Sequence, residues 1–419
     1  MRRVLIKGQT KLEGEVKISG SKNAALAILA ATILVPGKTV IRNVPDLLDV
    51  KTIIRVLRAL GLRAEYSRSQ DNTVEVWNNN GVKHVAPYEL VTRMRASFFV
   101  IGPILAKKKL AKVPLPGGCA IGSRPVNLHL KGLEALGAEV QMEHGFVIVK
   151  AEKLIGNMVY LDFPSVGATE TIMMAAALAD GTTTIENAAR EPEVIDLANF
   201  LNRAGAKITG AGTEEVKIQG VAELKPVEHG VIPDRIEAGT FMVAAAITRG
   251  NLKILDVIPD HVETIMHKLQ EAGVKTEVCN NQIMVSAADA PKAIDVKTLP
   301  YPGFPTDMQP QLTTLLCLAK GTSMVTETVF ENRFMHIHEL NRMGAEVKLE
   351  GQSAIIKGVA GLSSAPVKVS DLRAGAALVL AGLVAEGETI IEDRDHHIER
   401  GYEKLDKKLK ALGVDIKMI

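Results

Sequence analysis

Three basic residues stand at the starts of predicted helices, where a positive charge is unfavourable unless an anion lies nearby. Lys22, Arg95 and Arg373 occupy matching places along the 419-residue chain. A helix N-terminus offers free N–H groups and a partial positive charge, so it suits phosphate or carboxylate and disfavours a cation. Surface capping with incidental ion pairs is the alternative. Because the placement recurs, we expect these helix starts to bind an anionic ligand.

Two further residues could transfer protons or act as nucleophiles. Asp307 opens another predicted helix, where Asp is a common N-cap, so its position alone also fits a purely structural role. Cys119 lies in the Gly- and Pro-rich stretch 114–125, five residues before Arg124. An exposed thiol near a cation is reactive because its pKa falls, whereas a buried thiol is a small apolar side chain. We predict an inserted binding loop here.

The elements that must position these residues recur along the chain. A helical apolar pattern, a glycine and an alternating strand appear six times, at a period of about 70 residues. Glycine directly after a helix is typical of a left-handed C-terminal stop. The six glycines are Gly61, Gly137, Gly205, Gly273, Gly344 and Gly413.

The Ala-rich helices of this pattern indicate an α/β fold with helices inside and sheets outside. The segments 171–180 and 374–385 are apolar on all sides, so they should be buried on all sides. A boundary candidate lies at 229–234, with three repeats on either side. An opening strand predicted at 4–12 could pair with either half, and one domain would then be discontinuous.

Composition argues against several classes of protein. The 45.0 kDa chain is 47% hydrophobic and 23% charged, which is typical of globular proteins. A net charge of +2 and 4% aromatic residues disfavour a nucleic-acid-binding protein. The longest apolar stretches fall short of the ~20 residues that a membrane span needs. Three scattered cysteines predict no disulfide framework and fit a reducing compartment, so we expect a cytoplasmic protein.

Motifs for metals and nucleotide phosphates are incomplete. The segment 117–122 has a glycine spacing like that of a phosphate-binding loop, but Ser-Arg follows it instead of Lys-Ser/Thr. The pair His336 and His338, and the pair His396 and His397, lack a third ligand at a recognisable spacing. We therefore predict no metal and no cofactor.

Nine short phrases, in order and spread over essentially the whole chain, resemble one family. The chain looks like the UDP-N-acetylglucosamine 1-carboxyvinyltransferases, MurA-type enolpyruvyl transferases of the EPSP synthase superfamily. The phrases occupy residues 21–24, 94–97, 116–119, 124–126, 165–169, 304–308, 331–334, 371–374 and 400–402.

The resemblance implies an α/β fold of two inside-out barrel domains, each of three βαβαββ-type repeats. This agrees with the six repeats seen in the sequence. The implied domains are 1–21 with 233–419, which form a discontinuous catalytic domain, and 22–232, which carries the Cys119 loop. In the family the domains close on the sugar nucleotide and the loop then folds over the site.

The resemblance also implies a reaction. The family transfers the enolpyruvyl group of phosphoenolpyruvate to the 3′-hydroxyl of UDP-N-acetylglucosamine by addition and elimination, and releases phosphate. This is the first committed step of bacterial peptidoglycan synthesis, and so of cell wall biogenesis, cell shape and division. The implied partners are these two small molecules, without nucleic acid and without insertion into a membrane.

Matching positions carry the family's site onto this chain. Cys119 aligns with the general acid, which also forms a covalent adduct with phosphoenolpyruvate and is the target of the epoxide antibiotic fosfomycin. Asp307 aligns with the residue that binds the attacking hydroxyl and is proposed as its base, and Lys22 and Arg400 complete the catalytic set. The phosphoenolpyruvate-binding residues are Lys22, Arg95, Arg124, Arg373 and Arg400. The sugar-nucleotide residues are Asn23, Arg95, Arg124, Pro125, Val126, Asn127, Leu128, His129, Ser165, Val166, Gly167, Asp307 and Val329.

Two departures and two competing interpretations accompany this assignment. Asn127 stands where many members have Asp, and Phe163 where some have Lys, so contacts to the nucleotide could differ. The shikimate-pathway enolpyruvyl transferase shares the fold, but the Cys119 loop and the Arg-Pro-Val phrase argue against it. A sugar-nucleotide-binding paralogue with a regulatory role is the alternative from another class, and the retained Lys22, Cys119, Asp307 and Arg400 argue against that.

Overall fold

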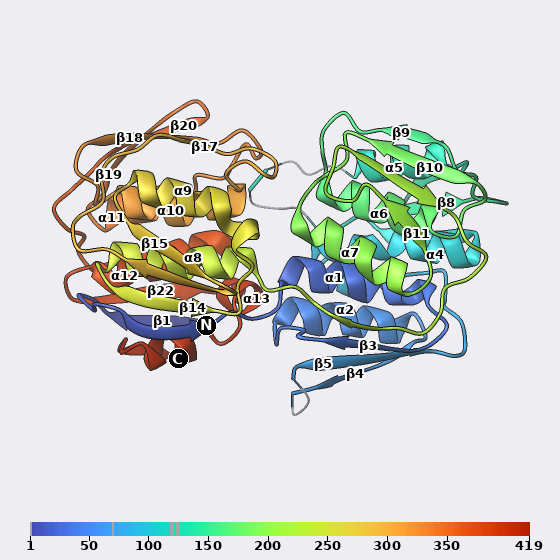
Figure 1. The fold of residues 1–419 in the computed structure, drawn as a ribbon, viewed down its shortest axis with the longest axis horizontal. Helices are drawn as coiled ribbons and strands as arrows, with labels where there is room; N and C mark the ends of the chain where they lie inside the picture. Colours follow the sequence, from blue (N-terminus) through green and yellow to red (C-terminus); the bar gives the residue numbers. More distant parts are fainter. Residues whose placement is uncertain (1, 69–70, 118–120, 123–125) are drawn as a thin grey trace. The chain divides into compact units, whose positions relative to one another are not determined.

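The computed structural model describes residues 2–68, 71–117, 121–122 and 126–419. Cys119, Arg124 and Pro125 lie outside these ranges. The chain divides into two compact units, each of which is described by itself (Figure 1). Unit 1 comprises Met1–Ser19, Ala120–Ser123 and Pro233–Ile419, and unit 2 comprises Gly20–Cys119 and Arg124–Ile232.

Unit 2 holds three sheets, with strand orders β13-β3-β5-β4, β6-β8-β7 and β11-β12-β10-β9. Its strands are β3 (Gly37–Arg42), β4 (Arg63–Ser67), β5 (Thr73–Asn78), β6 (Leu110–Pro114), β7 (Glu139–Glu143), β8 (Phe146–Lys150), β9 (Met158–Tyr160), β10 (Thr182–Glu186), β11 (Lys207–Thr209), β12 (Glu215–Gln219) and β13 (Glu228–Gly230). Its helices are α1 (Lys22–Ala31), η1 (Thr32–Leu34), α2 (Leu48–Ala59), α3 (Tyr88–Val91), η2 (Arg95–Val100), α4 (Ile101–Lys108), α5 (Asn127–Ala135), α6 (Val166–Ala176) and α7 (Pro192–Arg203).

Unit 1 also holds three sheets, with strand orders β21-β22-β1-β23, β15-β16-β14-β2 and β17-β18-β20-β19. Its strands are β1 (Arg2–Lys7), β2 (Glu13–Lys17), β14 (Asn251–Leu255), β15 (Lys275–Cys279), β16 (Gln282–Ser286), β17 (Val296–Lys297), β18 (Thr322–Thr326), β19 (Glu346–Glu350), β20 (Ser353–Lys357), β21 (Pro366–Lys368), β22 (Glu388–Asp393) and β23 (Ile416–Met418). Its helices are α8 (Arg235–Ile247), η3 (Pro259–Val262), α9 (Glu263–Glu271), η4 (Thr306–Met308), α10 (Gln309–Leu316), α11 (His336–Arg342), α12 (Leu372–Val384), α13 (His397–Gly401) and α14 (Leu405–Ala411).

Each unit has inner helices that the sheets surround. Helices α1, α4 and α6 in unit 2, and α8, α10 and α12 in unit 1, are buried along most of their length. Figure 1 shows them inside their units, with strands on the outside. The buried apolar residues form one cluster in each unit. The predicted arrangement of helices inside and sheets outside is confirmed.

The six predicted helix stops occur where the sequence places them. All six glycines have positive φ values, between 90° and 105°. Residues other than glycine adopt this conformation at a steric cost, which explains the residue type. Three of these stops fall in unit 1 and three in unit 2, so the repeat pattern describes the folded chain.

One local prediction was wrong, and a second differs in the type of helix. A single opening strand at 4–12 does not form, because β1 ends at Lys7 and β2 starts at Glu13. Gly8 passes so close to the carbonyl of Ala385 that a Cβ atom would meet it, and Gln9 has a positive φ of 59°. Strands β1 and β2 then pair with β22 and β14, both in unit 1.

The second difference concerns the helix start at Arg95. The chain forms a short helix, α3, and then a 3-10 helix that begins at Arg95 before α4 follows. The inner helix of the second repeat therefore begins later than the pattern indicated. No helix of the described ranges is both long and apolar enough to cross a membrane.

Candidate active site

The carboxylate of Asp307 is held by two arginines in unit 1. Arg333 Nη2 donates to Oδ1 at 2.9 Å, and Arg373 donates to Oδ2 through Nε at 3.1 Å and Nη2 at 2.9 Å. Both arginine side chains are buried, at 2% and 3% exposure, whereas Asp307 keeps 28%. Two guanidinium groups favour the charged carboxylate, and the exposed fraction leaves it open to a ligand.

The local helix starts explain why Asp307 is available for this contact. Asp307 is the middle residue of η4, and neither η4 nor α10, which follows it, has a side-chain cap hydrogen bond. The structural interpretation of Asp307 as an N-cap is therefore wrong. Asp371 performs that role for α12, because its Oδ1 accepts from the N–H groups of Arg373 and Ala374. The same cap fixes the backbone that presents Arg373.

Glu327 ties the segment before Asp307 to the segment that holds Val329. Its Oε2 accepts from Thr306 Oγ1 at 2.9 Å, and its Oε1 accepts from Thr298 Oγ1 and from the N–H of Val329, both at 2.8 Å. Glu327 is 1% exposed. This buried carboxylate places Val329, a predicted sugar-nucleotide contact, in the same part of unit 1 as Asp307.

Arg400 lies on the short helix α13, which packs against α12. Asp393 caps the start of α13 by accepting from the N–H groups of His397 and Ile398. Burial opposes ionisation of Asp393, but the hydrogen bonds from His397 and Ile398 outweigh it and lower its pKa. Arg400 thus stands next to the helix that carries Arg373. Unit 1 brings together Asp307, Arg373, Arg400 and Val329.

Lys22, the first residue of α1 in unit 2, is buried beside a carboxylate. Its Nζ lies 3.5 Å from Asp49 Oδ2, and the two side chains are 10% and 6% exposed. Ser21 caps the helix by accepting from the N–H of Ala24 at 3.4 Å. A carboxylate therefore offsets part of the unfavourable placement of a cation at a helix start, in addition to any anion that binds there.

The other predicted residues of unit 2 gather at neighbouring helix starts. The 3-10 helix η2, which Arg95 begins, contacts both α1 and α6. Asn127, Leu128 and His129 open α5, and α5 packs against α6, which Ser165 caps.

His129 and Gly167 fix how closely α5 and α6 approach. His129 Nδ1 lies 2.9 Å from Thr171 Oγ1, which joins the two helices. A Cβ atom at Gly167 would lie 3.0 Å from His129 Cε1 and 3.0 Å from Phe99 Cε1. Glycine leaves just enough space for the two helix starts to meet. The predicted residues on α5 and on α6 therefore form one strip.

Helix α6 also carries a buried acid that the prediction missed. Glu170 is 1% exposed, and neither carboxylate oxygen has a hydrogen-bond partner among the described residues. Burial raises its pKa well above the ordinary value, and Glu193 and Glu191 at the start of α7 add to the effect. Burial therefore favours the protonated, uncharged form of Glu170.

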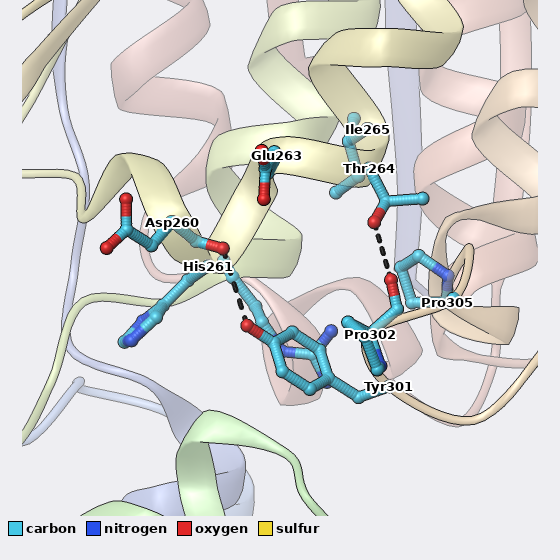
Figure 2. Close-up of a pocket in the computed structure, with 10 residues that line it drawn as sticks. Asp260, His261, Glu263, Thr264, Ile265, Tyr301, Pro302 and Pro305 are labelled. Atoms are coloured by element: carbon cyan, nitrogen blue, oxygen red, sulfur yellow. Dashed lines mark hydrogen bonds between the residues drawn. The ribbon is translucent and has the colours of Figure 1, made fainter. Parts of the chain in front are cut away.

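A small pocket of unit 1 anchors the loop that leads to Asp307. Figure 2 shows Tyr301, Pro302 and Pro305 facing the residues around the start of α9. Thr264 Oγ1 donates to Pro302 O at 2.6 Å, and the Tyr301 hydroxyl lies 3.4 Å from Asp260 O. The pocket measures about 20 Å³, room for roughly one water. It fixes the loop and is too small for a substrate.

A larger hollow of about 1140 Å³ lies elsewhere in unit 1, beside the last residues of α8 and α12. None of the predicted site residues lines it. Arg373 and its partner Asp307 lie at the N-terminal end of α12 instead, so this hollow does not include the predicted site residues.

The described cysteines and His336 differ in their exposure. Cys317 is fully buried, and burial raises the pKa of its thiol to about 12, whereas Cys279 is exposed on β15. His336 is buried, and burial lowers its pKa, so its ring is neutral. No group of three or more metal-ligating side chains occurs within the described ranges.

Comparison with known proteins covers nearly the whole chain. The model of the EPSP synthase family (3-phosphoshikimate 1-carboxyvinyltransferase) matches residues 6–409. The chain belongs to the EPSP synthase family. A relative from Caldanaerobacter subterraneus, named UDP-N-acetylglucosamine 1-carboxyvinyltransferase 1, is 57% identical over 97% of this chain and 96% of its own length. A relative from Geobacter metallireducens, named UDP-N-acetylglucosamine 1-carboxyvinyltransferase, is 54% identical over the full length of both chains.

Two solved structures share the fold. The enolpyruvyl transferase NikO from Streptomyces tendae superimposes with a TM-score of 0.90 at 26% identity, covering 100% of this chain and 98% of its own. EPSP synthase from Acinetobacter baumannii gives a TM-score of 0.75 at 17% identity, covering 100% of this chain and 99% of its own. The expected α/β fold of two domains is thereby confirmed.

In this member of the EPSP synthase family, sequence analysis assigned no role to the residues that hold the predicted site residues in place. Arg333 and Tyr402 belong to quoted phrases, but no role was assigned to them. Asp49 and Glu327 were missed entirely. A buried charge inside an amphipathic pattern, as at Asp49 in α2, is the signal that could have drawn attention to them.

Proposed function

We propose that the chain transfers the enolpyruvyl group of phosphoenolpyruvate to the 3′-hydroxyl of UDP-N-acetylglucosamine and releases phosphate. It is an enzyme of peptidoglycan synthesis, a UDP-N-acetylglucosamine 1-carboxyvinyltransferase by activity. Relatives of that name, more than half identical over the full length, support the choice of acceptor. The observation that carries the chemistry is the Asp307 carboxylate, partly exposed and held between two buried arginines.

Asp307 orients the attacking hydroxyl and accepts its proton. Hydroxyl addition to a double bond needs a base within hydrogen-bond reach, and a fixed carboxylate supplies one. Arg333 binds Oδ1 and Arg373 binds Oδ2, and together they hold the carboxylate in a single orientation. The hydroxyl approaches from the exposed side.

Cys119 supplies the opposite proton transfer. It donates a proton to the methylene carbon C3 of phosphoenolpyruvate while the sugar oxygen bonds to C2. The tetrahedral intermediate then loses phosphate from C2 and returns a proton from C3 to the Cys119 thiolate, which restores the double bond. In the covalent adduct the Cys119 sulfur takes the place of the sugar oxygen on C2. Its loop is rich in glycine, and the same thiol, once deprotonated, is the nucleophile that forms the adduct.

The cations bind the two anionic groups of phosphoenolpyruvate. A phosphate and a carboxylate together call for several positive side chains at one place. We assign Lys22, Arg95, Arg124, Arg373 and Arg400 to this role. Arg373 supports this role, because its Nη1 atom is buried and has no hydrogen-bond partner among the described residues.

The strip on α5 and α6 binds the sugar nucleotide. Helix N-termini present N–H groups to phosphate oxygens, and both helices begin here. Asn127 can still accept a hydrogen bond through its carbonyl where an Asp would accept through its carboxylate. Phe163 is 41% exposed and offers no charge, so a phosphate contact that some relatives have is absent at this position.

The two domains carry different parts of the proposed site. We propose that 1–21 with 233–419 form the catalytic domain that holds Asp307, and that 22–232 carry the Cys119 loop and the sugar-nucleotide strip. We also place the enzyme in the cytoplasm, because Cys279 and Cys317 are free thiols and free thiols persist in a reducing compartment.

Phosphate release tests the proposed reaction. Purified protein is mixed with phosphoenolpyruvate and UDP-N-acetylglucosamine, beside a tube with shikimate 3-phosphate and a Cys119→Ala control. Phosphate should appear with the sugar nucleotide alone and fall strongly in the control. Release with shikimate 3-phosphate would replace the acceptor, and silence in both tubes with intact sugar-nucleotide binding would favour a regulatory paralogue.

A further inference from the structure

A buried polar cluster lies beneath Asp307 in unit 1. Gln311 Nε2 is 3.1 Å from the Tyr402 hydroxyl and 3.1 Å from Thr240 Oγ1, and the two hydroxyls are 3.0 Å apart. All three residues are at most 3% exposed. They come from α10, the end of α13 and α8, so they join three elements in the interior.

The hydrogen bonds of this cluster all donate in the same direction. Thr240 Oγ1 lies 2.8 Å from the carbonyl of Ile236, which can only accept, so the Thr240 proton goes there. The Gln311 amide lies 3.0 Å from the backbone carbonyl of Asp307, which fixes its N–H side toward the cluster. Tyr402 then accepts from Gln311 and donates to Thr240. Burial raises the pKa of Tyr402 although Arg373 opposes the shift, so the phenol keeps the proton it donates.

The cluster touches the Asp307–Arg373 pair at both ends. The ring of Tyr402 lies 5.4 Å from Arg373 Cζ, a distance that allows a cation–π interaction. Gln311 holds the backbone carbonyl of Asp307, and Arg373 holds its carboxylate. The ring and the amide therefore determine where the guanidinium and the carboxylate meet.

We propose that Tyr402 and Gln311, fixed by Thr240, are positioning residues for the reaction. They act through Arg373 and Asp307 and set the carboxylate in the orientation that accepts the hydroxyl proton. This inference rests on the proposed function. It extends that function to residues that touch neither substrate nor the reacting atoms.

Tyr402→Phe and Thr240→Val test the inference. Each removes one hydroxyl and keeps the bulk of the side chain, so kcat should fall about tenfold while the KM for UDP-N-acetylglucosamine changes less than twofold. Thr240→Ser keeps the hydroxyl that Thr240→Val removes, so it should retain most of the wild-type activity. That rescue distinguishes a misplaced carboxylate from a general packing defect.

Thr248→Val is the matched control. Thr248 lies at the other end of α8, and its hydroxyl bonds the carbonyl of Ala244 at 2.8 Å, as that of Thr240 bonds Ile236. The control should lose a similar amount of thermal stability and keep the wild-type kcat. If Tyr402→Phe and Thr240→Val match the kcat of Thr248→Val, the inference is overturned. An inactive wild-type protein would instead contradict the proposed function.

Discussion

Arg373 donates two N–H groups to a single carboxylate oxygen of Asp307, at 3.1 and 2.9 Å, although 66 positions separate the residues. Asp371, two residues before Arg373, caps the same helix, so the backbone that presents the guanidinium is fixed as well. This geometry joins the charge at the start of α12 to the proposed base. The predictions below follow from it and from the contacts around it.

Asp307→Asn should lower kcat by about 10²- to 10⁴-fold, because an amide cannot accept the hydroxyl proton. The two arginines keep an acceptor oxygen to bind, so the variant should stay folded. Steady-state phosphate release measures the loss. Asp256→Asn, a change at an exposed carboxylate paired with Lys17, is the control and should keep full activity. Wild-type kcat in Asp307→Asn would exclude Asp307 as the base.

Arg373→Lys should lower kcat/KM about tenfold more than Arg333→Lys. Lysine retains the charge but offers no planar fork, and Arg373 uses two N–H groups on Asp307 where Arg333 uses one. The two positions are equally buried, so they serve as controls for each other. Equal losses would show that charge alone matters at this site.

Gly167→Ala should raise the KM for UDP-N-acetylglucosamine about tenfold and change kcat less. The new methyl group would lie 3.0 Å from His129 Cε1, which forces the starts of α5 and α6 apart. Gly361→Ala is the control, since a Cβ atom there meets nothing within 4 Å. An unchanged KM in Gly167→Ala would remove the strip on α5 and α6 from the binding site.

These contacts show where sequence reasoning succeeds and where it stops. Gly61 allowed the end of its helix to be predicted, because the left-handed stop depends only on residues that are neighbours in the sequence. The role of Asp307 was harder to predict, because its position in the sequence fits both an N-cap and a catalytic base. Only the fold brings Arg333 and Arg373, from distant segments, to its carboxylate. Glu327 could not be found at all, since its role depends on Thr306 and Val329, which only the folded chain brings together.

The predicted helix start of the second repeat differs from the structure for a related reason. The residues at 92–97 have helical composition, but the chain inserts a 3-10 helix at Arg95 before α4. That segment contacts α1 and α6, which a local sequence pattern does not reveal. Cys119, Arg124 and Pro125 lie outside the described ranges, so their assignments stay predictions.

Glu170→Gln should stabilise the protein at alkaline pH. Burial raises the pKa of Glu170 well above its unfolded value of 4.5, so the folded state holds a proton that the unfolded state releases. Wild-type stability therefore falls as pH rises from 4.5 through the folded pKa, and the loss persists above it. Glutamine cannot ionise. We expect equal stability near pH 4.5 and a higher stability of Glu170→Gln than of wild type near pH 8.

Thermal unfolding at several pH values measures this difference. Glu215→Gln, at an exposed carboxylate paired with Lys217, should show no such dependence. A constant difference between Glu170→Gln and wild type across the pH range would mean that Glu170 is ionised in the folded protein.

Fosfomycin should alkylate Cys119 and leave Cys317 intact. The thiolate attacks the epoxide, and burial raises the pKa of Cys317 to about 12, so that thiol stays protonated and enclosed. Mass spectrometry of proteolytic peptides identifies the modified residue. Exposed Cys279 is the internal control and should react more slowly than Cys119. Full activity after complete treatment would contradict the role of Cys119.

The most direct measurement is the mass of the sugar nucleotide after incubation with phosphoenolpyruvate and the wild-type protein. The account predicts that UDP-N-acetylglucosamine gains one enolpyruvyl group for each phosphate released, and that Asp307→Asn and Cys119→Ala slow the gain strongly. An unchanged sugar nucleotide, beside shikimate 3-phosphate that has gained the group, would contradict it.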